Sequence, residues 1–338
     1  MDDRTGRPRV ALLIPPSRQP EVLTPETLAH LREVAEVVGG DQEASAIAAT
    51  LPTLLADADA CLTGWGTPPL TDEALDGARR LRLIAHTAGS VKHLLPASVF
   101  ARGIVVCHAA NIIADAVAEY TLLATLLGLR RVHEMDRALK AGARWREAVS
   151  APQGLLARRT VGLVGMGYVG RKVASLLRAL GPRLLVYDPY LGADDVAALG
   201  VESVFLDDLF EASEVVSVHA PTTPETHHLI GARQLDLLRD GAIFVNCARA
   251  WVVDQEALLR TLQTGRIWAA LDVFDEEPLP RESPFRALPN VLLTPHQAGH
   301  TRDSYQEQGR ALVAEIERFF GGGELQYRIS PESFARMA

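Results

Sequence analysis

Three glycine residues near the middle of the chain have the spacing of a nucleotide-binding turn. The segment 160–171 reads as an apolar strand, a turn that contains Gly165, Gly167 and Gly170, and the start of a helix. In such a turn the first glycine permits a tight bend, the second lets the backbone approach a pyrophosphate, and the third lets the helix pack closely on the strand. The helix N-terminus then offers N–H groups and a positive dipole end to phosphate oxygens. The spacing therefore predicts a dinucleotide site.

An acidic residue follows where the ribose of a dinucleotide needs a hydrogen-bond acceptor. Asp188 comes directly after the apolar run 184–187 and lies 18 residues after Gly170. A carboxylate at that point accepts hydrogen bonds from an adenosine ribose diol. Its charge repels a 2′-phosphate and no arginine follows it closely, so we expect NAD rather than NADP. The alternative is that Asp188-Pro189 is only a turn after a strand.

The elements that position these residues alternate between strands and helices. Near the N-terminus, apolar runs of strand length occupy 9–14, 60–62, 81–85 and 104–107. Helices are expected at 25–37, where Thr24 is a suitable N-cap, and at 71–80. A second alternating series begins at Thr160, with further strands expected at 163–165, 184–187, 215–219, 242–246, 269–274 and 291–293. This alternation is typical of doubly wound parallel α/β sheets, and 338 residues usually form two domains.

Two long helices flank the second series. The helix predicted over 114–141 is apolar on more than one face near its start, which indicates contact with two bodies, such as two domains or a second subunit. The helix predicted over 302–320 ends at the glycine residues 321–323, a strong helix stop. Residues 142–156 are expected to be irregular.

The composition excludes several classes of protein. The chain is 48% hydrophobic and 22% charged, which argues against a disordered or coiled-coil protein. Its net charge of −8 argues against nucleic acid or an anionic membrane as a partner. The cysteines Cys61, Cys107 and Cys247 form no CxxC pair, which excludes a zinc ribbon or a disulfide scaffold. The longest nearly apolar run, 116–129, is shorter than the ~20 residues of a spanning helix. The N-terminal apolar run is too short for a signal peptide. We expect a cytoplasmic protein without a metal site.

Three further motifs follow strands of the second series. They are Asn-Cys-Ala-Arg-Ala-Trp-Val-Val-Asp at 246–254, Leu-Asp-Val-Phe-Asp-Glu-Glu-Pro at 271–278 and Leu-Thr-Pro-His-Gln-Ala-Gly at 293–299. Together with the glycine turn, they resemble the D-isomer-specific 2-hydroxyacid dehydrogenases over about residues 10–320. The resemblance implies a Rossmann NAD-binding domain, 111–299, inserted into a flavodoxin-like substrate domain of residues 1–110 and 300–338. It also implies an NAD-dependent oxidoreductase that interconverts a D-2-hydroxy acid and its 2-keto acid.

The resemblance assigns catalytic roles to Arg249, Glu277 and His296. Reduction of a 2-keto acid needs a fixed cation for the carboxylate, and a guanidinium offers the paired donors that lysine lacks. It also needs a proton donor for the developing alkoxide, and imidazole titrates near neutral pH. A carboxylate on the other ring nitrogen fixes the tautomer and favours imidazolium. Each residue has an ordinary alternative (a surface ion pair, an exposed acid, a turn histidine), but all three follow strands of a nucleotide-binding sheet, where sites collect.

The resemblance also marks residues that line the two ligands. The cofactor-lining positions, besides the glycine residues, Asp188, Arg249 and His296, are Tyr168, Val169, His219, Ala220, Pro221, Cys247, Ala248, Asp272, Ala298 and Gly299. The substrate carboxylate is expected on the backbone of a loop that comprises Ala88, Gly89, Ser90 and Val91, together with Arg249 and His296. His219 could instead simply end a strand. Ser90 and Ala250 each replace a usual glycine, and the bulky Trp251 follows Ala250. These departures leave the substrate open.

The sequence leaves two kinds of function to compare. The first is a 2-keto acid reductase of the glyoxylate/hydroxypyruvate or phosphoglycerate dehydrogenase type. Formate dehydrogenases, a rival within the family, carry Gln where this chain has Glu277. The second is an NAD-sensing binding protein that resembles the C-terminal-binding transcriptional corepressors, which keep the same three catalytic residue types. Turnover of NADH with keto acids discriminates between the two.

The sequence also predicts an assembly. The helix that begins near residue 114 has more apolar surface than one packing face requires. The apolar and small residues concerned are Val117, Tyr120, Thr121, Leu123, Leu126 and Leu127. We expect a C2 homodimer with this helix and the segment 140–146 at the interface, as the resemblance also implies.

Overall fold

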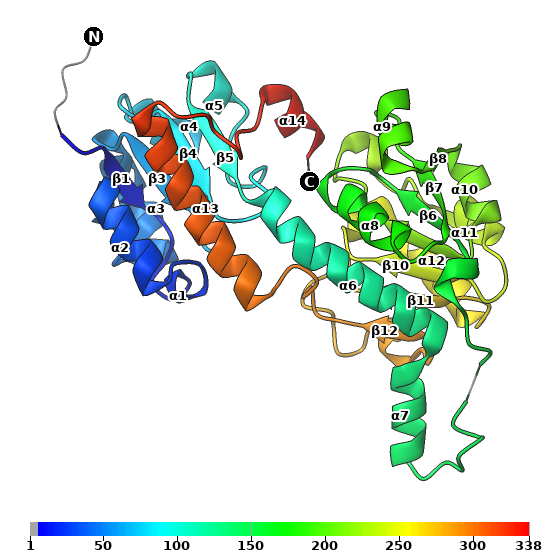
Figure 1. Cartoon of the computed structure of the whole chain (residues 1–338). Helices are drawn as coiled ribbons and strands as arrows, with labels where there is room; N and C mark the ends of the chain where they lie inside the picture. The colour runs from blue at the N-terminus through cyan, green and yellow to red at the C-terminus, as the bar shows by residue number, and fades with distance from the viewer. Residues whose placement is uncertain (1–5, 150, 338) are drawn as a thin grey trace. The chain divides into compact units, whose positions relative to one another are not determined.

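The chain divides into two compact units, each an open parallel sheet with helices (Figure 1). The computed structural model describes residues 6–149 and 151–337, so the outermost ends of the expected substrate domain lie outside the described residues. Unit 1 takes in Met1–Ile113 and His300–Ala338, and unit 2 is Ala114–Gly299. The sequence predicts the first boundary after residue 110. In the structure it lies three residues later, inside helix α6 (Ala110–Arg130).

Unit 1 is built on a five-stranded sheet in the order β2-β1-β3-β4-β5, and each neighbouring pair is parallel. This is the flavodoxin-like order. The strands are β1 (Arg9–Leu12), β2 (Glu36–Gly39), β3 (Ala60–Thr63), β4 (Leu83–His86) and β5 (Val105–His108). The helices are α1 (Gln19–Val22), α2 (Pro25–Val34), α3 (Ala44–Ala56), α4 (Asp72–Asp76), α5 (Ser98–Ala101), α13 (Arg302–Gly321) and α14 (Pro331–Arg336).

The core of unit 1 uses both ends of the chain. Strands β3 and β4 are buried along their whole length, as expected of apolar runs in a parallel sheet. Helix α13 contributes Leu312, Val313 and Ile316 to the same apolar cluster as Leu62 and Leu83. One side of this core is therefore supplied by residues that lie more than 200 positions further along the chain.

Two edge strands were not predicted from the sequence. The helix predicted over 25–37 ends at Val34, and Glu36–Gly39 pairs with β1 instead. Val37 and Val38 are β-branched and half-buried, a combination that suits a pleated edge better than a helix end. Strand β8 (Glu202–Ser203) is a two-residue edge strand of polar residues, so it has no apolar run to reveal it.

Unit 2 is built on a seven-stranded parallel sheet in the order β12-β11-β10-β9-β6-β7-β8. The strands are β6 (Thr160–Val164), β7 (Arg183–Tyr187), β8, β9 (Val215–Val218), β10 (Ile243–Asn246), β11 (Trp268–Leu271) and β12 (Val291–Leu293). Its helices after α6 are α7 (Val132–Lys140), α8 (Tyr168–Arg178), α9 (Ala193–Leu199), α10 (Leu206–Ala212), α11 (Ala232–Leu237) and α12 (Gln255–Gln263). The strand order reverses between β6 and β9, and open α/β sheets bind ligands at such a switch point.

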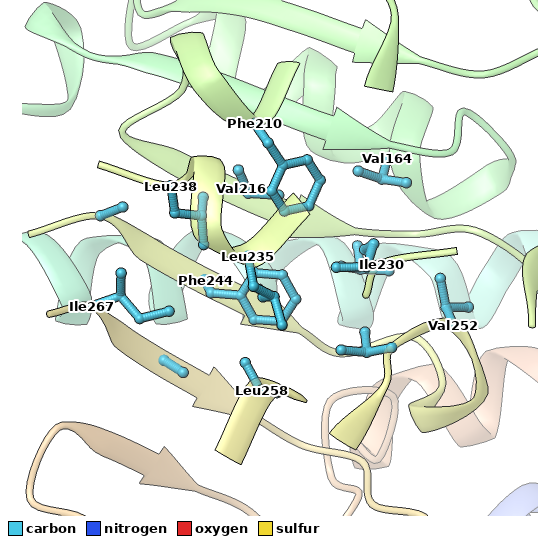
Figure 2. Close-up of a cluster of buried hydrophobic side chains, with 14 of the residues drawn as sticks. Val164, Phe210, Val216, Ile230, Leu235, Leu238, Phe244, Val252, Leu258 and Ile267 are labelled. Atoms are coloured by element: carbon cyan, nitrogen blue, oxygen red, sulfur yellow. The ribbon is translucent and has the colours of Figure 1, made fainter. Parts of the chain in front are cut away.

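Alternate residues of the unit 2 strands pack on opposite faces of the sheet. Unit 2 has an apolar core on each face of its sheet. In β10, Phe244 belongs to the first of these cores and Ile243 to the second. Figure 2 shows the first core, in which Phe244 lies near Leu258 of α12. The second core contains residues of α6 and α8. At Gly128 of α6 a Cβ would lie 2.8 Å from both Ile243 and Trp268, so this glycine lets the helix approach the sheet closely.

The helix predicted over 114–141 is two helices in the structure. They are separated at Arg131, which has a left-handed backbone with φ 48°. The Arg131 guanidinium lies 4.8 Å from the centre of the Trp268 ring and pairs with Glu134, and these contacts offset the cost of the unusual backbone. By length and composition α6 is apolar enough to cross a membrane, yet half of its apolar stretch is buried inside the protein, as in a core helix.

Candidate active site

The turn between β6 and α8 requires each of its outer glycine residues. Gly165 has φ 97°, and a Cβ there would lie 2.6 Å from the Ala220 amide nitrogen. At Gly170 a Cβ would overlap the Gly165 carbonyl oxygen. Adjacent residues aside, no described atom lies within 4 Å of the place that a Cβ would take at Gly167. The N-terminus of α8 therefore faces open space beside backbone N–H groups, which is what a phosphate needs.

The Asp188 carboxylate is fixed beside this turn. One oxygen accepts a hydrogen bond from the Met166 N–H at 2.7 Å, and the other accepts from the Tyr190 N–H at 2.8 Å. A carboxylate has about four acceptor sites, so further donors can still bind. Arg171 lies close enough to interact with Asp188 electrostatically, but its own donors bind the Met166 carbonyl and Asp195.

His219, at the end of β9, has an imidazole ring that the described protein atoms do not satisfy. The residue is 9% exposed, and neither ring nitrogen has a hydrogen-bond partner in the described part of the chain. Burial lowers the pKa of His219 to about 3, so the ring is neutral near pH 7. Leaving a buried polar group unpaired costs about 1–3 kcal/mol. A bound molecule at the loop 219–221 would supply the missing partner, so this loop fits a cofactor.

Arg249 follows β10 on a loop that is braced by its neighbours. The Asn246 side chain donates to the Arg249 carbonyl at 3.1 Å and accepts from the Ala248 N–H at 3.0 Å. The guanidinium donates to the Ala248 carbonyl at 2.7 Å. Burial lowers the pKa of Arg249 and the nearby Glu277 charge opposes that shift, so the group stays cationic. A partly buried cation of this kind suits a carboxylate ligand.

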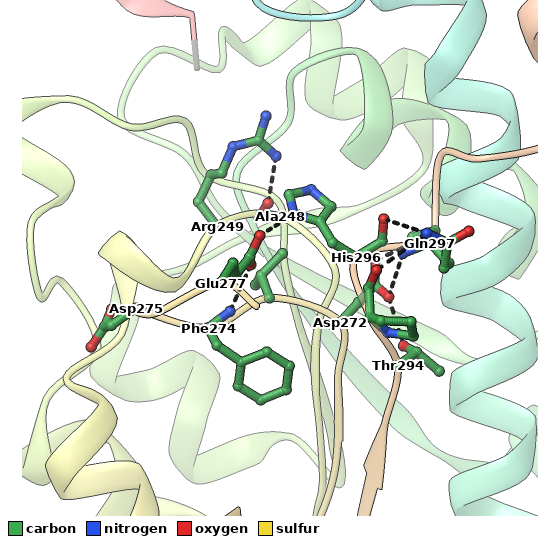
Figure 3. A network of polar contacts seen from close by, with 12 residues as sticks. Ala248, Arg249, Asp272, Phe274, Asp275, Glu277, Thr294, His296 and Gln297 are labelled. Carbon is green, nitrogen blue, oxygen red and sulfur yellow. Dashed lines mark hydrogen bonds and ion pairs between the residues drawn. The ribbon is translucent and has the colours of Figure 1, made fainter. Parts of the chain in front are cut away.

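Glu277 and His296 are in direct contact. Nδ1 of His296 lies 2.7 Å from Oε2 of Glu277, while Oε1 of Glu277 accepts from the Phe274 N–H at 2.9 Å. Arg249, Glu277 and His296 come from the loops after the adjacent strands β10, β11 and β12, and Figure 3 shows them gathered together. With Nδ1 on the carboxylate, Nε2 is the nitrogen that can exchange a proton with a bound molecule.

Asp272 holds the turn that carries His296. His296 has a left-handed backbone with φ 56°, and Asp272 accepts from the next two N–H groups, those of Gln297 and Ala298, both at 2.8 Å. The Thr294 hydroxyl also donates to Asp272, at 2.6 Å. The family resemblance assigns Asp272 to a cofactor contact, which stays a prediction. In the structure both oxygens of Asp272 support the turn of His296.

The predicted substrate loop, 88–91, belongs to unit 1, where it follows β4. His86 precedes it and is buried, with Nδ1 2.9 Å from the Thr63 hydroxyl. Within the loop, the Gly89 carbonyl lies 3.0 Å from Nδ1 of His108 at the end of β5. The loop is thus held from both neighbouring strands of the unit 1 sheet.

Comparison with known proteins identifies the family. Residues 122–298, more than half of the chain, match the model of the D-isomer specific 2-hydroxyacid dehydrogenase, NAD binding domain. The chain belongs to this family. The expected family, the two parallel-sheet units and the oxidoreductase class are thereby confirmed.

Relatives named as reductases and as dehydrogenases match most of this chain. A glyoxylate reductase of Korarchaeum cryptofilum is 37% identical over 274 residues, which cover 80% of this chain and 81% of the relative. A D-3-phosphoglycerate dehydrogenase of Methanocaldococcus jannaschii is 32% identical over 268 residues, 79% of this chain. The chain spans about half the length of that relative (50%). A solved phosphoglycerate oxidoreductase from Rhizobium etli has a TM-score of 0.80 at 29% identity and covers 96% of this chain and 99% of its own.

The residues of this family member fit an NAD-type cofactor. Asp188 and the glycine turn, with Tyr168 and Val169 at the start of α8, would hold the dinucleotide. The ring nitrogens of His219, which have no hydrogen-bond partner among the described residues, could bind it as well. Burial raises the pKa of the Cys247 thiol, so this residue is a neutral lining group. Ala298 and Gly299 are buried in the turn after His296. Across the described residues, no group of three or more His, Cys, Asp or Glu is arranged to hold a metal ion.

Two residues of the hydroxyacid dehydrogenase site were not predicted from the sequence. Thr294 links Asp272 to α6, because its hydroxyl accepts from the Tyr120 hydroxyl at 2.6 Å. The hydroxyl residue directly before Pro295 and His296 was a usable signal for Thr294. Tyr120 lies 174 positions earlier, so only the folded chain reveals its contact.

Proposed function

We propose that this hydroxyacid dehydrogenase reduces a small 2-keto acid to the D-2-hydroxy acid with NADH. The observation that carries the proposal is the Glu277–His296 contact at 2.7 Å beside the cation of Arg249, all on loops of the cofactor-binding unit. The relatives support a small substrate, since the names glyoxylate reductase and D-3-phosphoglycerate dehydrogenase recur among them. The matched glyoxylate reductase is also closer to this chain in length.

The chain's own residues account for binding and proton transfer. Arg249 would pair with the substrate carboxylate. A bound dihydronicotinamide supplies the hydride that forms the new C–H bond at the carbonyl carbon. His296 then donates a proton from Nε2 to the oxygen, which becomes the hydroxyl. Glu277 holds Nδ1 and stabilises the protonated ring, and the same groups run in reverse for oxidation.

We propose NAD rather than NADP as the cofactor. Asp188 is fixed with acceptor capacity to spare beside the glycine turn, where ribose hydroxyls would reach it. Its negative charge opposes a 2′-phosphate. Arg171 is the nearby cation, and its bonds to Asp195 and the Met166 carbonyl draw it away from a phosphate.

We also propose a cytoplasmic homodimer. The three cysteines are free and buried, as is usual in a reducing compartment. Exposed apolar side chains gather on α6, α7 and the segment after them, where a second copy of the chain would cover them. They are Leu123, Leu126, Val132, Leu139, Trp145 and Val149. Of the other residues expected at this interface, Val117, Tyr120 and Leu127 pack against an apolar core of unit 2 and Thr121 is buried, so the structure does not present them to a partner.

A substrate screen tests the catalytic proposal. Glyoxylate, hydroxypyruvate, pyruvate, phenylpyruvate and branched keto acids are each supplied with NADH, and NADH loss is followed by its absorbance. We expect turnover of at least one small keto acid, and His296→Ala should remove most of it while NADH still binds. An enzyme that binds NADH and turns over none of the panel would contradict the proposal and favour an NAD-sensing binding protein.

A further inference from the structure

Trp251 connects the loop of Arg249 to a second loop. Its indole N–H donates to the Thr223 carbonyl at 2.9 Å, although the residue is 41% exposed. The His227 ring packs against the indole with ring centres 4.1 Å apart. Trp251 follows β10, whereas Thr223 and His227 follow β9. The side chain therefore joins the loops that follow two adjacent strands.

The contact at Thr223 extends to the proposed cofactor loop. The Thr223 N–H donates to the Thr226 hydroxyl at 2.9 Å, and the Thr226 hydroxyl donates to the Pro221 carbonyl at 2.6 Å. Pro221 is the last residue of the loop 219–221, which begins with the buried His219. A continuous set of hydrogen bonds thus links Trp251 to the backbone of that loop.

The backbone of the same two segments is also paired. The His228 N–H donates to the Trp251 carbonyl and the Ile230 N–H to the Val252 carbonyl, both at 3.0 Å. His228 has a left-handed backbone with φ 49°, and its ring stacks on that of His227 at 4.0 Å. This turn places the His227 ring against Trp251. The indole is therefore held on one side by a hydrogen bond and on another by ring packing.

Only a short stretch of backbone separates Trp251 from Arg249. Arg249 precedes Trp251 by two residues, and its carbonyl accepts from Asn246 at the end of β10. Without the indole contact to Thr223, the C-terminal side of this loop would be held only by the backbone hydrogen bonds of residues 251 and 252. The separation between the guanidinium and the loop 219–221 would then be less tightly fixed.

We propose that Trp251 is a positioning residue that sets the separation between Arg249 and the loop 219–221 through Thr223 and His227. The inference rests on the proposed roles of Arg249 in substrate binding and of this loop in cofactor binding. Because Trp251 is partly exposed, it contributes less to the core than to the placement of the loops. Its loss should weaken the binding of keto acid and of NADH together.

Trp251→Phe tests the hydrogen bond, since the ring can still pack on His227 while the N–H donor is lost. We expect KM for the keto acid and Kd for NADH each to rise about three- to tenfold, the scale of one neutral hydrogen bond. His227→Ala should act in the same direction, and the amides of Thr223, Glu225 and Thr226 should exchange hydrogen faster in both variants. Phe205→Leu, at an aromatic residue that is 80% exposed elsewhere in unit 2, is the matched control.

The outcomes separate the possible roles. Unchanged KM and Kd in Trp251→Phe would overturn the proposal. If Tm fell while both constants stayed the same, Trp251 would have a purely structural role, and the proposal would also be wrong. The NADH titration is made without substrate, so it does not depend on turnover. If the unaltered protein reduces no keto acid, the proposed function fails, and the NADH titration alone decides whether Trp251 positions the cofactor loop.

Discussion

Glu277 holds His296 at 2.7 Å with one carboxylate oxygen while its other oxygen is fixed by the Phe274 N–H. The carboxylate therefore cannot turn from the ring without losing one of two hydrogen bonds. A charged acceptor at Nδ1 defines the tautomer of the ring and stabilises its protonated form. The pair is thus suited to delivering a proton from Nε2.

Replacement of Glu277 tests this relationship. Glu277→Gln keeps the size of the side chain but removes the charge that stabilises imidazolium. We expect kcat/KM for keto acid reduction to fall at least about tenfold. NADH affinity should not change.

Steady-state kinetics of keto acid reduction measure this fall in kcat/KM. Glu276→Gln changes the exposed neighbouring acid and is the matched control. A Glu277→Gln variant with the same kcat/KM as the unaltered enzyme would show that Glu277 has another role.

The proposed preference for NAD over NADP rests on Asp188. Charge-assisted hydrogen bonds are worth about 1.5–3 kcal/mol, so we expect kcat/KM with NADH to exceed that with NADPH by at least about tenfold. Asp188→Ser should weaken NADH use and reduce this preference, since both the acceptor pair and the repulsion of a 2′-phosphate are lost. Asp194→Ser alters a nearby acid on α9 and serves as the control. Equal use of both cofactors by the unaltered protein would mean that Asp188 only shapes a turn.

The buried residues His86 and His219 should make the folded protein less stable in acid. Burial lowers the pKa of His86 and of His219 to about 3, from an ordinary value near 6.5. At pH values between the lowered and the ordinary pKa, these two histidines bind protons in the unfolded chain but not in the folded chain. The free energy of unfolding should therefore fall as pH drops from about 6.5 towards 3, by up to about 1.4 kcal/mol per pH unit for each histidine.

Urea unfolding at a series of pH values measures this slope. The carboxylates of the protein titrate in the same range, so the informative quantity is the difference between the unaltered protein and His86→Gln. We expect a shallower acid loss in the variant. Parallel curves would show that His86 is protonated without cost in the folded protein.

The assembly proposal predicts the mass in solution. Light scattering at micromolar concentration should give about twice 36.6 kDa. Leu123 is 51% exposed on α6, so Leu123→Glu should place a charge in the proposed interface and shift the protein towards monomer. Phe205→Glu changes an exposed apolar residue outside this surface and should leave the dimer intact. A mass of 36.6 kDa for the unaltered protein would mean a monomer and would contradict the proposal.

Much of the architecture follows from local signals in the sequence. Gly165 and Gly170 are predicted correctly because close backbone approach excludes any Cβ at those positions. Thr24 caps α2 as predicted, accepting from the Thr27 N–H. Each of these signals is carried by residues a few positions apart.

The features that escaped prediction depend on contacts between distant parts of the chain. Val37 and Val38 form a strand only because β1 lies beside them. Arg131 interrupts a helix whose pattern continues, since Trp268 and Glu134 hold its guanidinium. The role of Asp272 in the turn of His296 depends on the N–H groups of Gln297 and Ala298, which lie 25 and 26 positions further along the chain.

The division of unit 1 between the two ends of the chain sets an order for folding on the ribosome. Synthesis proceeds from the N-terminus, so residues 114–299 are complete before α13 emerges. Until then, the apolar surface around Leu62 and Leu83 lacks Leu312 and Ile316 and remains open to other chains. A premature stop codon just after Gly299 would thus leave unit 2 intact but would release a product with an uncovered sheet, which is a substrate for chaperones and proteases.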